Sequence, residues 1–212
     1  MAGILQVDVP ALFPETGPVY AVLIGEAPGP KGADKTGIPF WGDAAGRLLY
    51  RTLMDAGYAQ IPSAAWDDWD GERFRLKNLK PTVVYLALTN AFPRCPTNDG
   101  RTFRQPTNRE LADPENIARL ANELAGAAAR SPARLLVVPI GERARWAVDR
   151  LGASTGNIAE CLPHPSRQGL LGADKDHGRG RRMVDLEANW AHSLKRTLSC
   201  QPRCENAQVA PV

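Results

Sequence analysis

Short apolar runs that alternate with stretches of helical spacing are the main pattern along this chain. The runs Val19–Ile24, Val83–Leu88 and Leu135–Ile140 are rich in β-branched residues, which is typical of strands buried in a parallel sheet. Apolar spacing predicts helices over residues 43–54, 108–129, 142–151 and 184–198, and a fourth short strand near Cys161 and Leu162. This alternation predicts an α/β fold, with a mostly parallel central sheet flanked by helices on both faces.

The length of the chain fits a single domain. Its 212 residues are 43% hydrophobic, which is enough to bury one core. We expect one domain over residues 1–199 and a flexible C-terminal tail over residues 200–212. Residues 61–81 lack clean periodicity and predict an irregular excursion with at most a short helix.

The charged residues suggest a function in only one segment of the chain. The formal net charge is +3, which permits a polyanionic partner without identifying one. Residues 163–182 carry five basic and two acidic side chains, and such a segment suits a phosphate backbone. The segment Met1–Glu15 has no basic run followed by an apolar stretch, so we expect no secretory signal, no membrane span and a cytoplasmic protein.

Polar residues follow the predicted strands at the points where chemistry is usually found in such folds. Glu26, Asn90 and His164 each come at or just past the end of a predicted strand. The carboxyl ends of parallel strands share one edge of the sheet, so these side chains are expected to face one crevice. The loop after the first strand, GEAPG at residues 25–29, is neither GxxxxGK[ST] nor GxGxxG, which disfavours a nucleotide-phosphate site.

Several short motifs occur in the order known from one family. They are GEAPG at 25–29, PFWG at 39–42, LTNA at 88–91 and HPS at 164–166. Together they resemble the uracil-DNA glycosylase superfamily, most closely the branch called family 4. The resemblance implies an enzyme that flips uracil out of single- or double-stranded DNA and hydrolyses its N-glycosidic bond, leaving an abasic site.

The same resemblance implies roles for individual residues. Phe40 would stack on uracil, Asn90 would pair with O4 and N3–H, and His164 would donate to O2 of the departing base. Glu26 would stabilise the sugar cation and orient water, with Asp34 and Asp43 as alternatives. The rest of the expected uracil pocket is the loop Gly25, Ala27, Pro28 and Gly29.

Two positions depart from the best-known branch, which has an Asp where this chain has Ala27 and a bulky aromatic where it has Gly29. Because that Asp is missing, Asp34 and Asp43 stay open beside Glu26 for water activation. Exclusion of the thymine methyl is assigned to a wall formed by Phe40 and Trp41, or is expected to be looser.

The segment after the HPS motif resembles the family's DNA intercalation loop. Ser166 would bind a flanking phosphate, and Gln168, Leu170 or Leu171 would fill the gap left by the flipped base. The expected phosphate contacts are Arg167, Arg179, Arg181 and Arg182.

The cysteines bear on cofactors. Relatives in the family 4 branch hold a [4Fe–4S] cluster on two cysteines ahead of the first motif and two after the TN segment. This chain has cysteines at 95, 161, 200 and 204, none of them ahead of Gly25. We therefore expect no cluster, no metal and no other cofactor, and we expect a monomer. Cys200 and Cys204 leave open a metal or disulfide role in the tail.

Two other functions remain open on sequence alone. One is a uracil-DNA binding protein that has lost turnover or traps its product. The other is a nonspecific nucleotide-binding α/β module, which would bind uracil-free and uracil-containing DNA equally.

Overall fold

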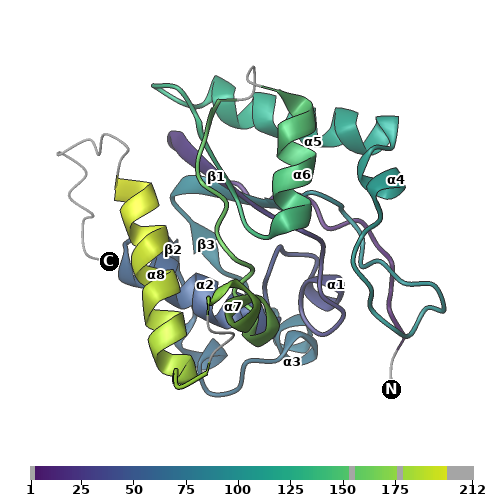
Figure 1. Ribbon diagram of the computed structural model, residues 1–212, viewed down its shortest axis with the longest axis vertical. Coiled ribbons are helices and arrows are strands. Elements are labelled where there is room, and N and C mark those ends of the chain that lie inside the picture. The colour runs from purple at the N-terminus through teal and green to yellow at the C-terminus, as the bar shows by residue number, and fades with distance from the viewer. Residues whose placement is uncertain (1–2, 153–155, 176–178, 200–212) are drawn as a thin grey trace.

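A four-stranded parallel sheet forms the centre of the molecule (Figure 1). The computed structural model describes residues 3–152, 156–175 and 179–199. The strand order is β4-β1-β5-β6. The strands are β1 (Val19–Gly25), β4 (Tyr85–Asn90), β5 (Leu136–Pro139) and β6 (Asn157–Ile158). The expected single α/β domain with a parallel sheet is confirmed.

Helices cover both faces of this sheet. Alternate side chains of β1 enter two different cores, because successive side chains of a strand point to opposite faces. Val22 and Ile24 pack with apolar residues of α5 (Pro114–Ala129) and α6 (Glu142–Leu151), whereas Leu23 packs with those of α2 (Ala44–Asp55) and α8 (Met183–Ser199). Figure 1 shows α5 and α6 together on one side and α2 and α8 on the other. Burial on both faces explains the continuous apolar runs in the sequence.

Shorter elements connect these layers. The pair β2–β3 is antiparallel, and the excursion over residues 61–81 holds a 3₁₀ turn and one short helix. The elements are α1 (Ala33–Thr36), β2 (Ala59–Gln60), η1 (Ser63–Ala65), α3 (Gly71–Leu76), β3 (Thr82–Val83), α4 (Asn108–Leu111) and α7 (Arg167–Ala173). In the described parts of the chain, no helix is both long and apolar enough to span a membrane.

Three expected elements differ from the structure. The helix expected over residues 108–129 is split into α4 and α5, because Asp113 caps a new helix and Pro114 has no N–H to continue the old one. The strand expected over residues 83–88 is interrupted before Tyr85, whose φ is 65°. The fourth strand is β6, and Leu162 forms only an isolated bridge with Ile140. The expected tail, residues 200–212, lies outside the described residues.

Candidate active site

The carboxyl ends of β1 and β4 lie side by side and bring the first motif against Asn90. Gly25 and Asn90 are register partners across the two strands. A Cβ atom on Gly25 would stand 2.4 Å from Cζ of Phe40 and 2.7 Å from Oδ1 of Asn90. Only a glycine at this position leaves room for both the ring and the amide. The sequence reasoning placed these three residues together, and the structure does so as well.

Asn90 carries an unsatisfied donor. The residue is 1% exposed, and its Nδ2 is buried without a hydrogen-bond partner among the described residues. A buried amide N–H without a partner is rare, because it loses its bond to water and gains nothing in return. The donor lies at the end of β4, so it needs an acceptor that the described residues do not supply.

Phe40 is held in an unusual backbone conformation. Its φ is 62°, in the left-handed region, which costs a bulky residue of the order of 1–3 kcal/mol. The neighbouring helix α2 makes this possible: a Cβ on Gly46 would lie 1.7 Å from the Phe40 carbonyl oxygen, so the backbones meet closely. The Tyr50 hydroxyl donates to the Pro39 carbonyl at 2.8 Å. These contacts fix the Phe40 ring beside Gly25.

His164 completes the group from the other end of the chain. Its ring centroid lies 6.5 Å from that of Phe40, with 28° between the ring planes. The backbone N–H of Ser166 donates to His164 Nδ1 at 3.4 Å, so the ring proton resides on Nε2. Burial lowers the pKa of His164 from its ordinary 6.5. Both observations favour a neutral imidazole that offers an Nε2–H donor.

Glu26 follows Gly25 in the first motif, and its side chain bonds to the start of helix α6. Its Oε1 accepts a hydrogen bond from the Arg143 backbone N–H at 3.1 Å, and a Cβ on Gly141 would lie 2.5 Å from the same oxygen. Burial raises the pKa of Glu26, opposed by the Arg143 N–H and guanidinium. The helix has no side-chain cap from Gly141, so Glu26 supplies that cap. Sequence reasoning gave Glu26 a catalytic role and missed this structural one.

The loop that follows Gly25 wraps around an internal carboxylate. Asp43 Oδ2 accepts hydrogen bonds from the backbone N–H groups of Gly29 at 3.2 Å and Ala33 at 3.0 Å. Burial raises the pKa of Asp43 to about 6, although N–H groups of Ala33, Gly32 and Gly29 oppose the rise. The loop amides that a phosphate would need are thus taken by Asp43. This disfavours the nonspecific nucleotide-binding alternative.

The two alternative water-activating carboxylates both have structural partners. Asp43 holds the loop, and Asp34 accepts the backbone N–H groups of Leu5 at 2.8 Å and Gln6 at 3.1 Å. Within the same loop, Ala27 is half-buried and Pro28 is buried. A Cβ on Gly29 would lie 2.3 Å from Asp43 Oδ1, so the glycine is required by the carboxylate beside it.

The structure does not support Trp41 as part of the wall that was expected beside Phe40. Trp41 is fully buried, its ring packs against Tyr50, Trp69 and Phe74, and its Nε1 donates to the Leu79 carbonyl at 2.8 Å. Successive residues diverge here because the left-handed turn at Phe40 sends the next side chain into the core.

The expected intercalation loop is a helix. Ser166 caps α7 by accepting the Gly169 N–H at 3.2 Å, and Gly169 packs on the His164 carbonyl, where a Cβ would come within 2.3 Å. Leu170 is 5% exposed and belongs to the core, which corrects its assignment as an exposed wedge. Arg167, Gln168, Leu171 and Gly172 instead line an open surface hollow.

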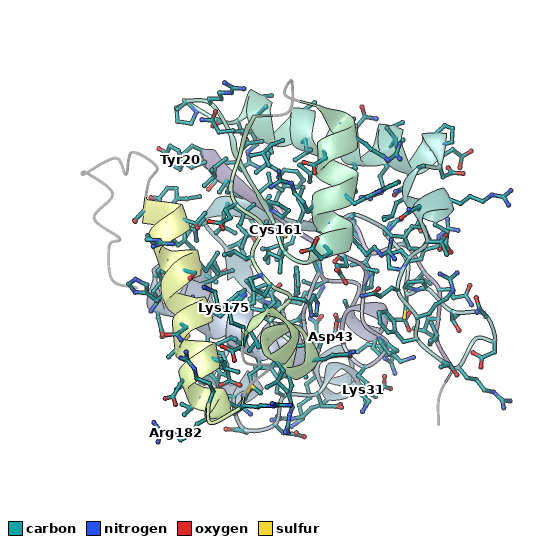
Figure 2. All side chains as sticks on the ribbon, in the orientation of Figure 1. Tyr20, Lys31, Asp43, Cys161, Lys175 and Arg182 are labelled. Atoms are coloured by element: carbon teal, nitrogen blue, oxygen red, sulfur yellow. The ribbon has the colours of Figure 1, made fainter. Side chains whose placement is uncertain are left out.

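The predicted basic residues lie on the surface after this helix. Arg179, Arg181 and Arg182 are exposed, and Arg182 forms an ion pair with Asp185 at 3.0 Å. Figure 2 shows Arg182 at the start of α8. Within the described ranges, nothing brings these arginines into contact with the pocket residues, so their role in binding DNA stays a prediction.

The cysteines do not form a cluster site in the described part of the chain. Cys95 is buried, Cys161 is partly buried with its Sγ 3.5 Å from the Gly141 carbonyl, and both are free thiols. Residues 3–152, 156–175 and 179–199 contain no group of three or more His, Cys, Asp or Glu side chains that could hold a metal ion. Cys200 and Cys204 lie outside the described residues.

Asn90 has polar neighbours on α5 that the sequence did not predict. Three polar residues of α5, namely Asn116, Arg119 and Glu123, bond to the end of β4. Their spacing on one helix face was visible in the sequence, but their partners were not.

Comparison with known proteins gives one relative and one family model that match this chain. A type-5 uracil-DNA glycosylase of Thermus thermophilus is 46% identical over 43 residues, which are 20% of this chain and 20% of that protein. The match thus spans a fifth of the relative, and the likeness to the family 4 branch stays a prediction. The model of the Uracil DNA glycosylase superfamily matches residues 14–198. With its pocket residues and fold inside this matched region, the chain belongs to the uracil-DNA glycosylase superfamily.

Proposed function

We propose that this protein hydrolyses the N-glycosidic bond of uracil in DNA and leaves an abasic site. The observation that carries the proposal is the buried Nδ2 of Asn90, which has no partner among the described residues and belongs to a side chain that borders Gly25 together with the Phe40 ring. An acceptor on a flat base stacked on Phe40 would satisfy it. Membership of the superfamily supports the same reading.

Asn90 explains why uracil would be preferred to cytosine. Its amide donates to the O4 acceptor of uracil, whereas cytosine carries an amino group at that position. A cytosine would leave two donors facing each other in a buried site. Sites built on such hydrogen bonds reject the wrong partner by about 10⁴-fold or more.

His164 would stabilise the leaving base. Negative charge grows on uracil O2 as the bond to the sugar breaks, and a neutral Nε2–H donor needs no proton transfer to meet it. The Ser166 N–H on Nδ1 fixes the tautomer that presents this donor. Losing one such donor typically costs about 100- to 1000-fold in rate.

Glu26 would act on the sugar side. The sugar becomes positively charged as the base leaves, and a carboxylate nearby stabilises that charge and orients water. The Arg143 N–H holds one oxygen of Glu26 in place. Glu26 thus has a capping role that the structure records and a catalytic role that we propose.

The surface beside the pocket would bind DNA. Helix α7 begins directly after the His164 motif, and its exposed Arg167 and Gln168 border a hollow with Leu171. A partly exposed apolar side chain beside an arginine suits a wedge at the site of a flipped nucleotide.

A single-turnover assay on a uracil oligonucleotide, followed by alkaline cleavage, tests the proposal. We expect strand breaks at uracil with the wild type, about 100- to 1000-fold slower reaction with His164→Ala, and wild-type rates with His192→Ala. His192 is a matched control because it is a second histidine, exposed on α8 and outside the four motifs.

Three outcomes would contradict the proposal or a part of it. A wild type that releases no uracil would reject the proposed enzyme, and equal, measurable rates in the wild type and His164→Ala would reject the role of His164. Tight, uracil-specific binding without base release would instead favour a binding protein that has lost turnover or traps its product.

A further inference from the structure

Helix α5 presents three polar side chains to the end of β4, directly behind Asn90. Arg119 Nη2 donates to the backbone carbonyls of Asn90 at 2.9 Å and Ala91 at 3.1 Å. Arg119 Nη1 donates to Glu123 Oε1 at 2.8 Å, and the Thr89 hydroxyl donates to Glu123 Oε2 at 2.6 Å. The ion pair of Arg119 and Glu123 therefore bonds to three consecutive residues at the end of β4, which are Thr89, Asn90 and Ala91.

Asn116 locks Arg119 into this geometry. Its Oδ1 accepts from Arg119 Nη2 at 2.9 Å, and its Nδ2 donates to the Ala91 carbonyl at 2.9 Å. Asn116 is 7% exposed, and the side chains of Arg119 and Glu123 are 22% and 16% exposed. Hydrogen bonds in such a sheltered network are stronger and more directional than those on an open surface.

The first motif clamps the same segment from the other side. The Ala91 N–H donates to the Gly25 carbonyl at 2.8 Å, and the Phe92 N–H donates to the Glu26 carbonyl at 3.0 Å. The backbone around Asn90 is thus fixed from both α5 and the GEAPG loop.

The amide of Asn90 needs this backbone support. Its Nδ2 has no hydrogen bond within the described structure, so nothing bonded to that nitrogen sets its direction before a base binds. We propose that Arg119, together with Glu123 and Asn116, is a positioning residue that aims the Asn90 amide at the base. This inference rests on the proposed function and adds a residue outside the pocket to it.

The chain offers a matched control for the ion pair itself. Arg145 and Asp149 on α6 have the same i,i+4 spacing and a 2.7 Å contact, with side chains 40% and 51% exposed. Arg145→Met removes an ion pair of the same spacing, on a more exposed helix surface, without touching β4. If Arg119 served only helix stability, the two substitutions would behave alike.

A double-mutant cycle tests the coupling to Asn90. We expect Arg119→Met to lower the single-turnover rate on uracil DNA by about 10- to 100-fold, because small misplacements of a reacting partner have effects of that size. In an Asn90→Ala background the same substitution is expected to have no further effect, since the amide that it positions is gone. The rate of Arg119→Lys should lie between those of the wild type and Arg119→Met, because a lysine cannot bond the two carbonyls and Glu123 in one plane. Arg145→Met should match the wild type.

A second measurement needs no activity. The side-chain amide signals of Asn90, assigned in ¹⁵N-labelled protein by their loss in Asn90→Ala, should shift or broaden in Arg119→Met and stay in place in Arg145→Met. Melting temperatures of all variants show that they are folded.

Equal rate losses from Arg119→Met with and without Asn90, or wild-type rates in Arg119→Met, would overturn the inference. If the wild type fails to release uracil, the proposed function fails. The amide signals then decide the positioning role alone, and unshifted signals in Arg119→Met would reject it.

Discussion

At the scale of single residues, the pocket retains features that folding by itself does not favour. Asn90 keeps a buried donor without an acceptor in the described structure, and Phe40 adopts a left-handed φ. Each is destabilising by itself and persists because the surrounding contacts outweigh it. Both occur where the motifs from distant strands meet, which is where such features are expected if they serve a ligand.

Glu26 allows its structural and proposed catalytic roles to be separated. Glu26→Ala removes the cap of α6 and should lower the free energy of unfolding by about 1 kcal/mol. Glu26→Gln keeps an oxygen for the Arg143 N–H, so it should retain most of the stability while losing activity. Urea denaturation and the single-turnover assay measure the two effects. Full activity in the Gln variant would show that Glu26 is only a helix cap.

His164 should make stability depend on pH below neutrality. Its pKa is lowered by burial, so below pH 6.5 the unfolded chain binds a proton at this residue more readily than the folded protein. Its contribution to stability is therefore present above pH 6.5 and is lost as the pH falls toward the folded pKa. We expect the loss of unfolding free energy between pH 7.5 and pH 5.5 to be smaller in His164→Asn than in the wild type. An equal loss in both proteins would indicate a solvent-exposed imidazole.

At the scale of elements, α7 shows how a functional surface is attached to the core. Its sequence contains two glycines, which favour a helix poorly, yet Ser166 caps it and Leu170 anchors it. The helix begins shortly after His164. A contact of DNA with α7 would thus be transmitted directly to the residue that we place at the departing base.

The two leucines of α7 should separate anchoring from binding. Leu170→Ala empties a core position and should lower the free energy of unfolding by about 2–5 kcal/mol. Leu171→Ala, in the surface hollow, should cost less stability and weaken binding to an oligonucleotide with an abasic site. Urea denaturation and fluorescence anisotropy report the two quantities. The reverse pattern would return Leu170 to the role of wedge.

At the scale of the whole molecule, the sequence predicted the strands and helices that depend on a local pattern of apolar residues. The strand ending at Gly25 and helix α6 are encoded by continuous apolar runs and helical spacing, and the strand-end rule placed Asn90 correctly. The motif order added Phe40 and His164. The backbone partners of Arg119 at the end of β4 and of Asp43 in the first loop were not predictable, because they lie 10 to 29 residues away and depend on how elements pack. Helix α7 was missed for the same reason, since tertiary contacts outweigh its weak propensity.

The distribution of charge predicts which surface residues contribute to DNA binding. A net charge of +3 is too small to bind DNA by overall attraction, so binding should depend on local arginines. Arg179 and Arg181 are exposed beyond α7, whereas Lys80 is exposed just before β3, outside the basic segment over residues 163–182. If each arginine neutralises one phosphate, replacing it with Gln should reduce the slope of log Kd against log salt by about 0.7 to 0.9. Lys80→Gln should leave the slope unchanged. Anisotropy titrations over a range of salt concentrations measure this, and equal slopes in all variants would place the DNA on another surface.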